Sequence, residues 1–404
     1  MKKIKKIVLC AGLALFVILM SCGRPSHILN SDIVGTININ LDELKKRETL
    51  LFSQLFETVN AVVLSDSVLI GDFTKILVHD DKIFILDRRL ICVHVFDRKG
   101  NYLRQIGSRG EGPGEMLSVS DMSIDRINNY IYILDRHSQR VNKYNIADGR
   151  FLSSVVFPRD IVRGSHFVYY NNKIFLAQSG VAATVCYLFR VLSLNDGNID
   201  FIVPTSYNQG WDGATNTNNN DGPFLFKSDG TPLFSHKFMY VVYEYSNQVL
   251  KPYLVLRGNS SNFFNSSVLS RFDVRNNPND FFEILQKDKY HSIHNFIDTD
   301  SFLFFTIFKG LRRHIFYCKE KSSAERIEHL IEDVFFNSNM DLMGTRFRFG
   351  AKDGNSVLFY ICSDGLDLIT FKLDYINDEN FVSHIRGLRN EEDFNGVILW
   401  YELK

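Results

Sequence analysis

Short apolar runs that end in polar turns recur along most of the chain. Four such runs lie between residues 75 and 106, where turn residues such as Asp80-Asp81 and Asp97–Gly100 separate them. The same arrangement returns between residues 121 and 156, and Ile133 follows its counterpart Ile85 by 48 residues. Four short antiparallel strands in each repeat of about 40–50 residues are typical of a β-propeller blade. The pattern therefore predicts two well-preserved neighbouring blades.

The later repeats are less regular, but strand-like runs of the same kind predict four further blades. These fall at residues 167–203, 224–256, 293–318 and 347–373, and a polar insert at 210–221 is predicted to be an exposed loop. The 48-residue period alone would allow seven blades, but helices and inserts lengthen the average blade. We therefore expect an all-β fold, a six-bladed β-propeller with four-stranded antiparallel blades and a few short helices in its second half.

Three segments of the second half carry helix signals. Pro278 precedes an apolar cluster, and proline is favoured in the first turn of a helix. Ser322 and Glu325 resemble a capping box before a second cluster that extends to residue 334. A weaker signal covers residues 381–388. We expect a short helix at each of these places.

The two ends of the propeller region are both strand-like. Ile33–Ile39 and Val397–Leu403 are rich in β-branched and aromatic residues. A propeller ring closes without an open edge when an N-terminal strand joins the last blade. We expect Ile33–Ile39 to do this, beside the C-terminal strand.

The composition fits a β-rich exported protein and gives no sign of a nucleic-acid partner. Charge is balanced, with 46 Lys and Arg against 46 Asp and Glu, while 35 Phe and 17 Tyr suit strands. Cys92, Cys186, Cys318 and Cys362 stand singly, without a CxxC spacing, so both disulfide pairing and buried free thiols are open for them.

The N-terminus has the order of an export signal. Lysines at positions 2–6 precede an apolar run over residues 7–19, which is too short to span a bilayer as a helix. The run ends in a Ser21-Cys22 pair that resembles the bacterial lipobox, although an ordinary signal peptide with an incidental cysteine has similar features. We expect a signal peptide at 1–21, lipid on Cys22 that holds the chain at a membrane, a tether at 22–32 and one propeller domain at 33–404. No acidic run follows Cys22, which favours the periplasmic face of the outer membrane over the cell surface.

Four features together resemble the six-bladed β-propeller lipoproteins of Bacteroidetes, distant relatives of NHL-repeat propellers. They are Cys22, the Leu69-Ile70-Gly71 segment, the stretch at 95–115 and the C-terminal stretch at 395–401. The resemblance covers nearly the whole chain after Cys22 and is most specific at 69–158. It implies a propeller fold and an envelope address, but that family mostly lacks an assigned activity.

A glycine-rich loop at residues 107–115 separates the two best repeats. Glycine loops can cradle phosphate, but that use needs a helix after the loop, and a P-loop also needs Lys-Ser/Thr. Here a strand-like run follows, so a sharp crossover between blades is favoured. Arg109, Glu111 and Glu115 remain candidate ligand contacts, because propellers bind through loops on a rigid scaffold.

Two aspartates occupy equivalent strand ends, Asp87 and Asp135. An aspartate there usually caps the turn through backbone N–H groups. The alternative is a ring of carboxylates around the channel that holds a divalent metal, as similar six-bladed lactonases and amidating lyases do.

His291 and His294 are predicted to point to opposite sides of a strand and to be incidental. Trp211, in the polar insert, is a candidate for stacking on a sugar.

Together these features favour a monomeric, lipid-anchored module that binds a protein, peptide or glycan of the cell envelope, or serves as a scaffold, without a cofactor. The alternative is a metal-dependent hydrolase or lyase with its site in the central channel, and a third is a purely structural envelope protein. The side chains that line the channel discriminate among them, because convergent carboxylates and histidines favour the enzyme.

Overall fold

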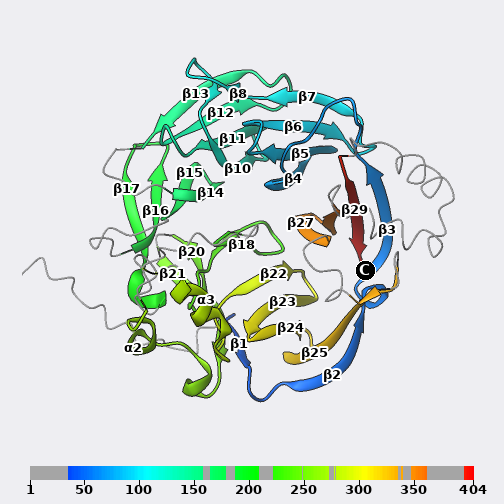
Figure 1. Ribbon diagram of the computed structural model, residues 1–404, viewed down its shortest axis with the longest axis vertical. Helices are drawn as coiled ribbons and strands as arrows, with labels where there is room; N and C mark the ends of the chain where they lie inside the picture. Colours follow the sequence, from blue (N-terminus) through cyan, green and yellow to red (C-terminus); the bar gives the residue numbers. More distant parts are fainter. Residues whose placement is uncertain are drawn as a thin grey trace, which may run out of the picture.

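The computed structural model describes residues 35–157, 164–178, 187–208, 222–247, 249–272, 277, 279–334, 338–339, 347–361 and 395–404. Over these residues the strands form six sheets arranged as a ring (Figure 1). Each sheet has four antiparallel strands at its centre. The predicted six-bladed β-propeller is therefore confirmed.

The six blades follow one another in chain order, except that the last one contains strands from both ends of the chain. Blade 1 consists of β4 (Lys75–His79), β5 (Lys82–Asp87), β6 (Cys92–Asp97) and β7 (Tyr102–Ile106). Blade 2 consists of β10 (Val119–Asp125), β11 (Tyr130–Asp135), β12 (Arg140–Asn145) and β13 (Phe151–Val156). Blade 3 consists of β14 (Gly164–Tyr170), β15 (Lys173–Gln178), β16 (Tyr187–Ser193) and β17 (Ile199–Pro204). Blade 4 consists of β18 (Phe224–Phe226), β19 (Pro232–Phe234), β20 (Val241–Ser246) and β21 (Val249–Arg257). Blade 5 consists of β22 (Ile293–Asp298), β23 (Phe302–Lys309), β24 (Leu311–Cys318) and β25 (Ser323–Glu332), which also pairs with β26 (Ser338–Asn339). Blade 6 consists of β27 (Phe347–Asp353), β28 (Ser356–Ile361), β29 (Val397–Leu403) and β3 (Phe56–Val63).

The first strand of each blade lies nearest the axis. Neighbouring first strands contact one another, as β4 does with β10 and β27, β10 with β14, and β18 with β22. Because strands alternate in direction within a blade, two kinds of connection emerge on the same face of the ring. They are the connection from second to third strand and the connection from one blade to the next. We call this side the loop face.

The core lies between the blades. Five consecutive residues of β5, Ile83 to Asp87, are buried, because a blade packs against a neighbour on each side. Phe84 and Val95 of blade 1 join Met122 and Ile133 of blade 2 in one apolar cluster. The continuous apolar runs seen in the sequence therefore reflect burial on both faces of each blade.

The segment that closes the ring differs from the one we expected. β3 pairs antiparallel with the C-terminal β29, whereas β1 (Ile37–Asn40) adds in parallel to β21 of blade 4. β2 (Lys45–Leu51) adds in parallel to β25 of blade 5, so the N-terminal segment follows the outside of three blades (Figure 1). The prediction for Ile33–Ile39 was wrong. Phe56 of β3 packs 5.1 Å from Phe52 and 5.2 Å from Tyr401 between ring centroids, an aromatic anchor that the earlier segment lacks.

Of the three expected helices, one is confirmed as α3 (Asn279–Gln286). The segment at 322–334 is instead largely β25, because pairing with β24 on one side and β2 on the other outweighs its local capping signal. The third, at 381–388, lies outside the described residues, as does the strand expected at 368–373. The remaining short elements are η1 (Phe52–Gln54), η2 (Thr205–Asn208), η3 (Ser260–Asn262), α2 (Ser266–Leu269) and the β8 (Ser108–Arg109)–β9 (Glu115–Met116) pair.

Two of the cysteines in question can be placed. Cys92 is buried and Cys318 is half-buried, and both are free thiols. Cys186 and Cys362, like Cys22, lie outside the described residues. In the part of the chain that the structure describes, helices are too short or too polar to cross a bilayer.

Candidate functional site

The glycine loop at 107–115 is a compact crossover between blades 1 and 2. β8 and β9 pair in parallel within it, and the Gly110 N–H donates to the Met116 carbonyl at 3.0 Å. Gly114 has φ +79°, and a Cβ at this position would lie 2.6 Å from Phe151 Cβ, so both conformation and space require glycine. A strand, β10, follows the loop, so it lacks the helix N-terminus that a phosphate cradle needs.

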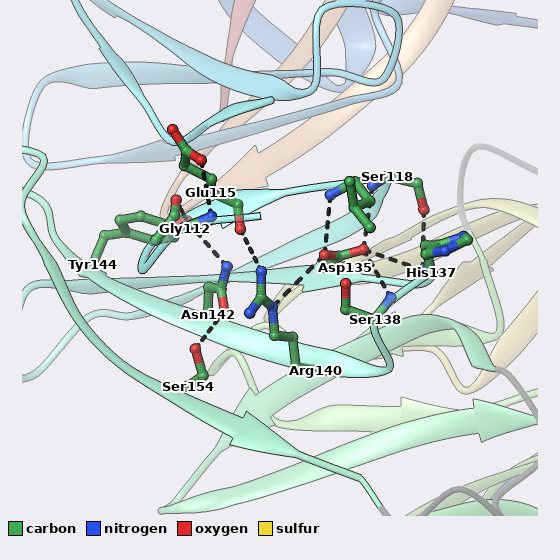
Figure 2. A network of polar contacts seen from close by, with 12 residues as sticks. Gly112, Glu115, Ser118, Asp135, His137, Ser138, Arg140, Asn142, Tyr144 and Ser154 are labelled. Atoms are coloured by element: carbon green, nitrogen blue, oxygen red, sulfur yellow. Dashed lines mark hydrogen bonds and ion pairs between the residues drawn. The ribbon is translucent and has the colours of Figure 1, made fainter. Parts of the chain in front are cut away.

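The three candidate residues of this loop do not converge. Glu115 turns back into the loop, where its Oε2 accepts the Gly112 N–H at 2.9 Å (Figure 2). Arg109 is exposed and donates to the Arg89 carbonyl at 3.4 Å, and Glu111 is exposed as well. Glu115 therefore shapes the loop, while Arg109 and Glu111 are the two that a ligand on the loop face can reach.

Asp135 is fully buried and serves as a local hub (Figure 2). Its Oδ2 lies 3.7 Å from Arg140 Nε, and Arg140 also donates to the Glu115 carbonyl at 2.5 Å. Four backbone N–H groups donate to its carboxylate at 3.1–3.2 Å, those of Leu117, Ser118, His137 and Ser138. The carboxylate thus joins the crossover loop to the turn after β11, as the turn-capping interpretation expects.

Asp87 holds the equivalent position in blade 1 and is also fully buried. It accepts the Gly71 N–H at 2.6 Å and the Leu90 N–H at 2.8 Å. Although burial opposes ionisation, the His94 side chain and these N–H groups hold the pKa of Asp87 below its usual value. Both aspartates are engaged by their own turns, on second strands rather than on the axial first strands.

Cys92, His94 and Asp87 lie in contact, but not as a nucleophile, base and orienting acid. The same nitrogen, His94 Nε2, is 3.5 Å from Cys92 Sγ and 3.4 Å from Asp87 Oδ2, whereas such a triad needs opposite sides of the ring. Burial, and then the charge of Asp87, raise the pKa of Cys92 to about 12, so the thiol stays protonated. This cluster is structural. The remaining predicted residues, Trp211 and Cys22, lie outside the described residues.

A second group of polar side chains lies where first strands begin at the loop face. His166 is near the start of β14, and His294 is near the start of β22, with His291 just before that strand. His236 and Lys237 lie in the connection from β19 to β20. We call these five residues the axial cluster.

The axial cluster brings together residues that are distant in the sequence. The Phe238 N–H donates to the His291 carbonyl at 2.7 Å, which joins the β19–β20 connection to the entry of β22. Burial is the first cause of the lowered pKa values of His291, His294 and His236. The charge of Lys237 contributes to the lowering in His291 and His294, and the charge of His166 contributes to it in His236. The cluster therefore spans blades 3, 4 and 5.

His291 and His294 point to a common partner rather than to opposite sides. His291 Nδ1 lies 2.7 Å and His294 Nε2 3.1 Å from the hydroxyl oxygen of Ser292. His291 precedes β22, and the register of β22 shifts after His294, where Asn295 has φ +49°. The expectation for a regular strand was therefore wrong, because His291 lies before the strand begins and does not follow its alternation.

Three of these histidines are half-buried. His166, His236 and His294 each keep partial solvent exposure. Burial nevertheless lowers the pKa of all three, to about 4 for His236 and about 3 for His294. Solvent therefore reaches this part of the axial cluster, although burial disfavours the charged form of all three imidazoles.

The axial cluster also contains a buried lysine. Lys237 is 8% exposed, and burial lowers its pKa to about 8. Asp121, whose charge acts on His166, forms an ion pair with Lys75 at 2.7 Å and accepts the Phe167 N–H at 2.8 Å. Among the described residues, the cluster therefore brings imidazoles and an ammonium group together at the loop face.

Sequence reasoning missed His166, His236 and Lys237. The available signal was that three of the cluster histidines directly adjoin a serine, in the pairs Ser165-His166, Ser235-His236 and His291-Ser292. Only the ring geometry brings these pairs together. Over the described residues, no group of three or more His, Cys, Asp or Glu side chains is arranged to hold a metal ion.

A β-propeller with an axial cluster of histidines and a lysine on its loop face is the class that this geometry defines. The chain belongs to the DUF4934 family, described as a domain of unknown function, whose model matches residues 34–402. No curated protein matches the chain.

A solved structure from Bacteroides shares the fold. A Bacteroides fragilis protein named as a putative exported protein superposes with a TM-score of 0.68 at 17% identity, over 92% of this chain and 99% of that one. At that identity the likeness shows the fold alone. A DUF4221 member from Bacteroides vulgatus also matches, with a TM-score of 0.49 at 9% identity, over 87% and 97% of the two chains.

Proposed function

We propose that this protein is an exported, lipid-anchored binding module whose envelope ligand, a protein, peptide or glycan, docks on the loop face over the axial cluster. The observation that carries the proposal is the cluster itself, in which His166, His236 and His294 come from three different blades and keep partial solvent exposure. A rigid ring that presents convergent polar groups near its loops is a usual form of binding site.

The proposed location rests on the N-terminal pattern and on a structural relative. The basic, apolar and Ser21-Cys22 segments stand in the order of a lipoprotein signal. The Bacteroides fragilis relative carries the name of an exported protein, which supports an extracytoplasmic location. Lipid on Cys22 would hold a monomeric ring at the periplasmic face of the outer membrane.

The anchor is tested by comparing the full chain with Cys22→Ser in labelling with a radioactive fatty acid and in membrane fractionation. The natural chain is expected to take up label and to sediment with membranes, and the variant to lose both. Label uptake that persists in the Cys22→Ser variant would contradict the anchor.

The docking face is tested with the full chain in non-ionic detergent against glycan arrays and fractionated envelope proteins. His236→Gln in the axial cluster and Arg109→Glu elsewhere on the loop face are expected to weaken saturable binding. Ile127→Glu is the matched control, because Ile127 is 86% exposed in the β10–β11 turn of the opposite face. Binding that only Ile127→Glu weakens, or no saturable binding at all, would overturn the proposal.

A further inference from the structure

We propose that the outer edge of blade 2 binds an extended, uncharged segment of a partner protein, which adds to the blade as a fifth strand. The strand that receives it is β13, at the rim of the ring (Figure 1). The inference goes beyond the proposed function, because it assigns a second binding surface that shares no residue with the axial cluster.

Four blades end in a fourth strand that has no further neighbour within the described residues. They are blades 1, 2, 3 and 6, whose outer strands are β7, β13, β17 and β3. An open edge is a template for strand pairing, and proteins usually blunt it with charged residues or proline. The residues of this kind in β7, β3 and β17 are Arg104, Glu57, Asp200 and Pro204. β13 contains neither a charged residue nor a proline, so its edge is left unprotected.

The backbone of β13 directs two donors and two acceptors toward this open edge. The Phe157 N–H donates to the Gln139 carbonyl at 2.9 Å, which makes Phe157 a hydrogen-bonded position in its pairing with β12. Positions alternate in an antiparallel ladder, so Val155 also bonds to β12. The N–H and C=O groups of Ser154 and Val156 therefore point away from β12, where an added strand can bond to them.

The side chains along this edge fit an uncharged strand. Val156 is 68% exposed, and Ser153 and Ser154 are exposed as well. An added strand would remove the Val156 side chain from water, which favours binding. The charges in the turn before β13, Asp148 and Arg150, lie 3.9 Å apart and pair with each other. A charged residue placed against the edge would lose its hydration without gaining an ion pair there.

Two other blades show that a fourth strand of this ring accepts a fifth. β1 pairs in parallel with β21 of blade 4, and β2 pairs in parallel with β25 of blade 5 (Figure 1). β1 is uncharged, and its four residues alternate isoleucine and asparagine. We expect the partner strand on β13 to have the same character, with apolar and small polar residues in alternation, because backbone bonds give affinity and alternate side chains give selectivity.

The experiment uses the full chain in non-ionic detergent and a fluorescent peptide with the sequence of residues 35–41, which contains β1. Binding is followed by fluorescence anisotropy. A second peptide of the same sequence is N-methylated at its amides, so that it keeps the side chains and lacks the N–H donors. A third has lysine in place of each isoleucine. The unmodified peptide is expected to bind saturably, and the other two are expected to be inert.

Variants then place the binding on β13. Val156→Lys is expected to weaken the peptide by about tenfold or more, because it replaces the apolar contact with a charge on the open edge. Ser154→Pro removes an N–H that β12 does not use, so it should leave the fold intact and weaken binding several-fold. Val249→Lys is the matched control, because Val249 is 53% exposed and begins β21, the strand with which β1 already pairs.

Four results would overturn the inference. They are no saturable binding of the unmodified peptide, equal binding of the N-methylated peptide, binding that Val156→Lys leaves unchanged, and binding that only Val249→Lys weakens. The last would mean that the peptide exchanges with β1 on blade 4. Sedimentation of the natural chain as a dimer that Val156→Lys dissociates would assign the edge to a second copy instead. Each of these outcomes leaves docking over the axial cluster standing, because the variants lie outside it.

Discussion

The two regular blades and the axial cluster treat buried charge in opposite ways. In blades 1 and 2, Asp87 and Asp135 are fully buried, and backbone N–H groups and a basic neighbour surround each carboxylate. In the axial cluster, burial lowers the pKa values of Lys237 and of the histidines, so the charged form of these groups is disfavoured. A carboxylate that accepts hydrogen bonds from neighbouring backbone N–H groups stabilises the fold, whereas a partly exposed imidazole with a lowered pKa is a group that a ligand can contact.

The difference follows from the regularity of the repeat. In the near-copies, the turn after the second strand has room for one carboxylate that caps it. In blades 4 and 5 that repeat is degenerate, and irregular connections bring His236, Lys237 and His291 to the axis. The well-preserved repeats therefore contain charged residues that stabilise the fold, whereas the blades that depart from the repeat contain the candidate functional site.

The largest effect is expected from Asp135→Ala. Removing this carboxylate leaves four buried N–H groups and Arg140 without their acceptor, which should lower the free energy of unfolding by about 3–5 kcal/mol. Urea denaturation followed by tryptophan fluorescence measures it. Asp148→Ala is the control, because Asp148 is exposed in a turn and its loss should cost under about 0.5 kcal/mol. Equal effects of the two variants would contradict the conclusion that the buried carboxylate of Asp135 stabilises the fold.

The second prediction concerns pH. The folded-state pKa of His236 and His291 is about 4 and that of His294 about 3, whereas the ordinary value is 6.5. Between the folded-state pKa and 6.5, the unfolded chain therefore binds more protons than the folded chain. Stability should therefore fall as the pH drops from 6.5 toward 4, by about 1 kcal/mol per histidine over the first unit. Asp87, with its lowered pKa, loses its contribution only below about pH 3.8.

Urea midpoints from pH 7.5 to 4.5, in buffers free of carboxylate and phosphate, check this window. His236→Gln should flatten the curve and His329→Gln should not. A midpoint that stays constant down to pH 4.5 would show that the histidines are not desolvated.

The smallest effect on stability is expected from Arg109→Ala and Glu111→Gln. Both side chains are exposed, so each variant should stay within about 0.5 kcal/mol of the natural chain. A change in ligand affinity at unchanged stability would extend the binding surface from the axial cluster to the glycine loop. Unchanged affinity would confine the surface to the axial cluster.

Much of the fold could be predicted because its cause is local. The alternation of apolar runs and turns at 75–156 encodes strands and hairpins directly, and the strands of blades 1 and 2 lie where the pattern places them. The closing strand was misassigned because Ile33–Ile39 and Phe56–Val63 compete for one edge, and long-range packing of Phe52 and Phe56 against Tyr401 decides it. The segment at 322–334 was misassigned because pairing with β24 and β2 overrides its local helix signal.

By itself, the sequence determined the repeat, the six blades and the turn-capping aspartates, because strand periodicity and turn chemistry act over a few residues. Only the tertiary structure decided which histidines meet. His166, His236 and His291 are separated by up to 125 positions, and each alone looks like an incidental polar residue. Ring closure brings the segments that carry these histidines close to one axis. The resulting burial lowers the pKa values of their side chains.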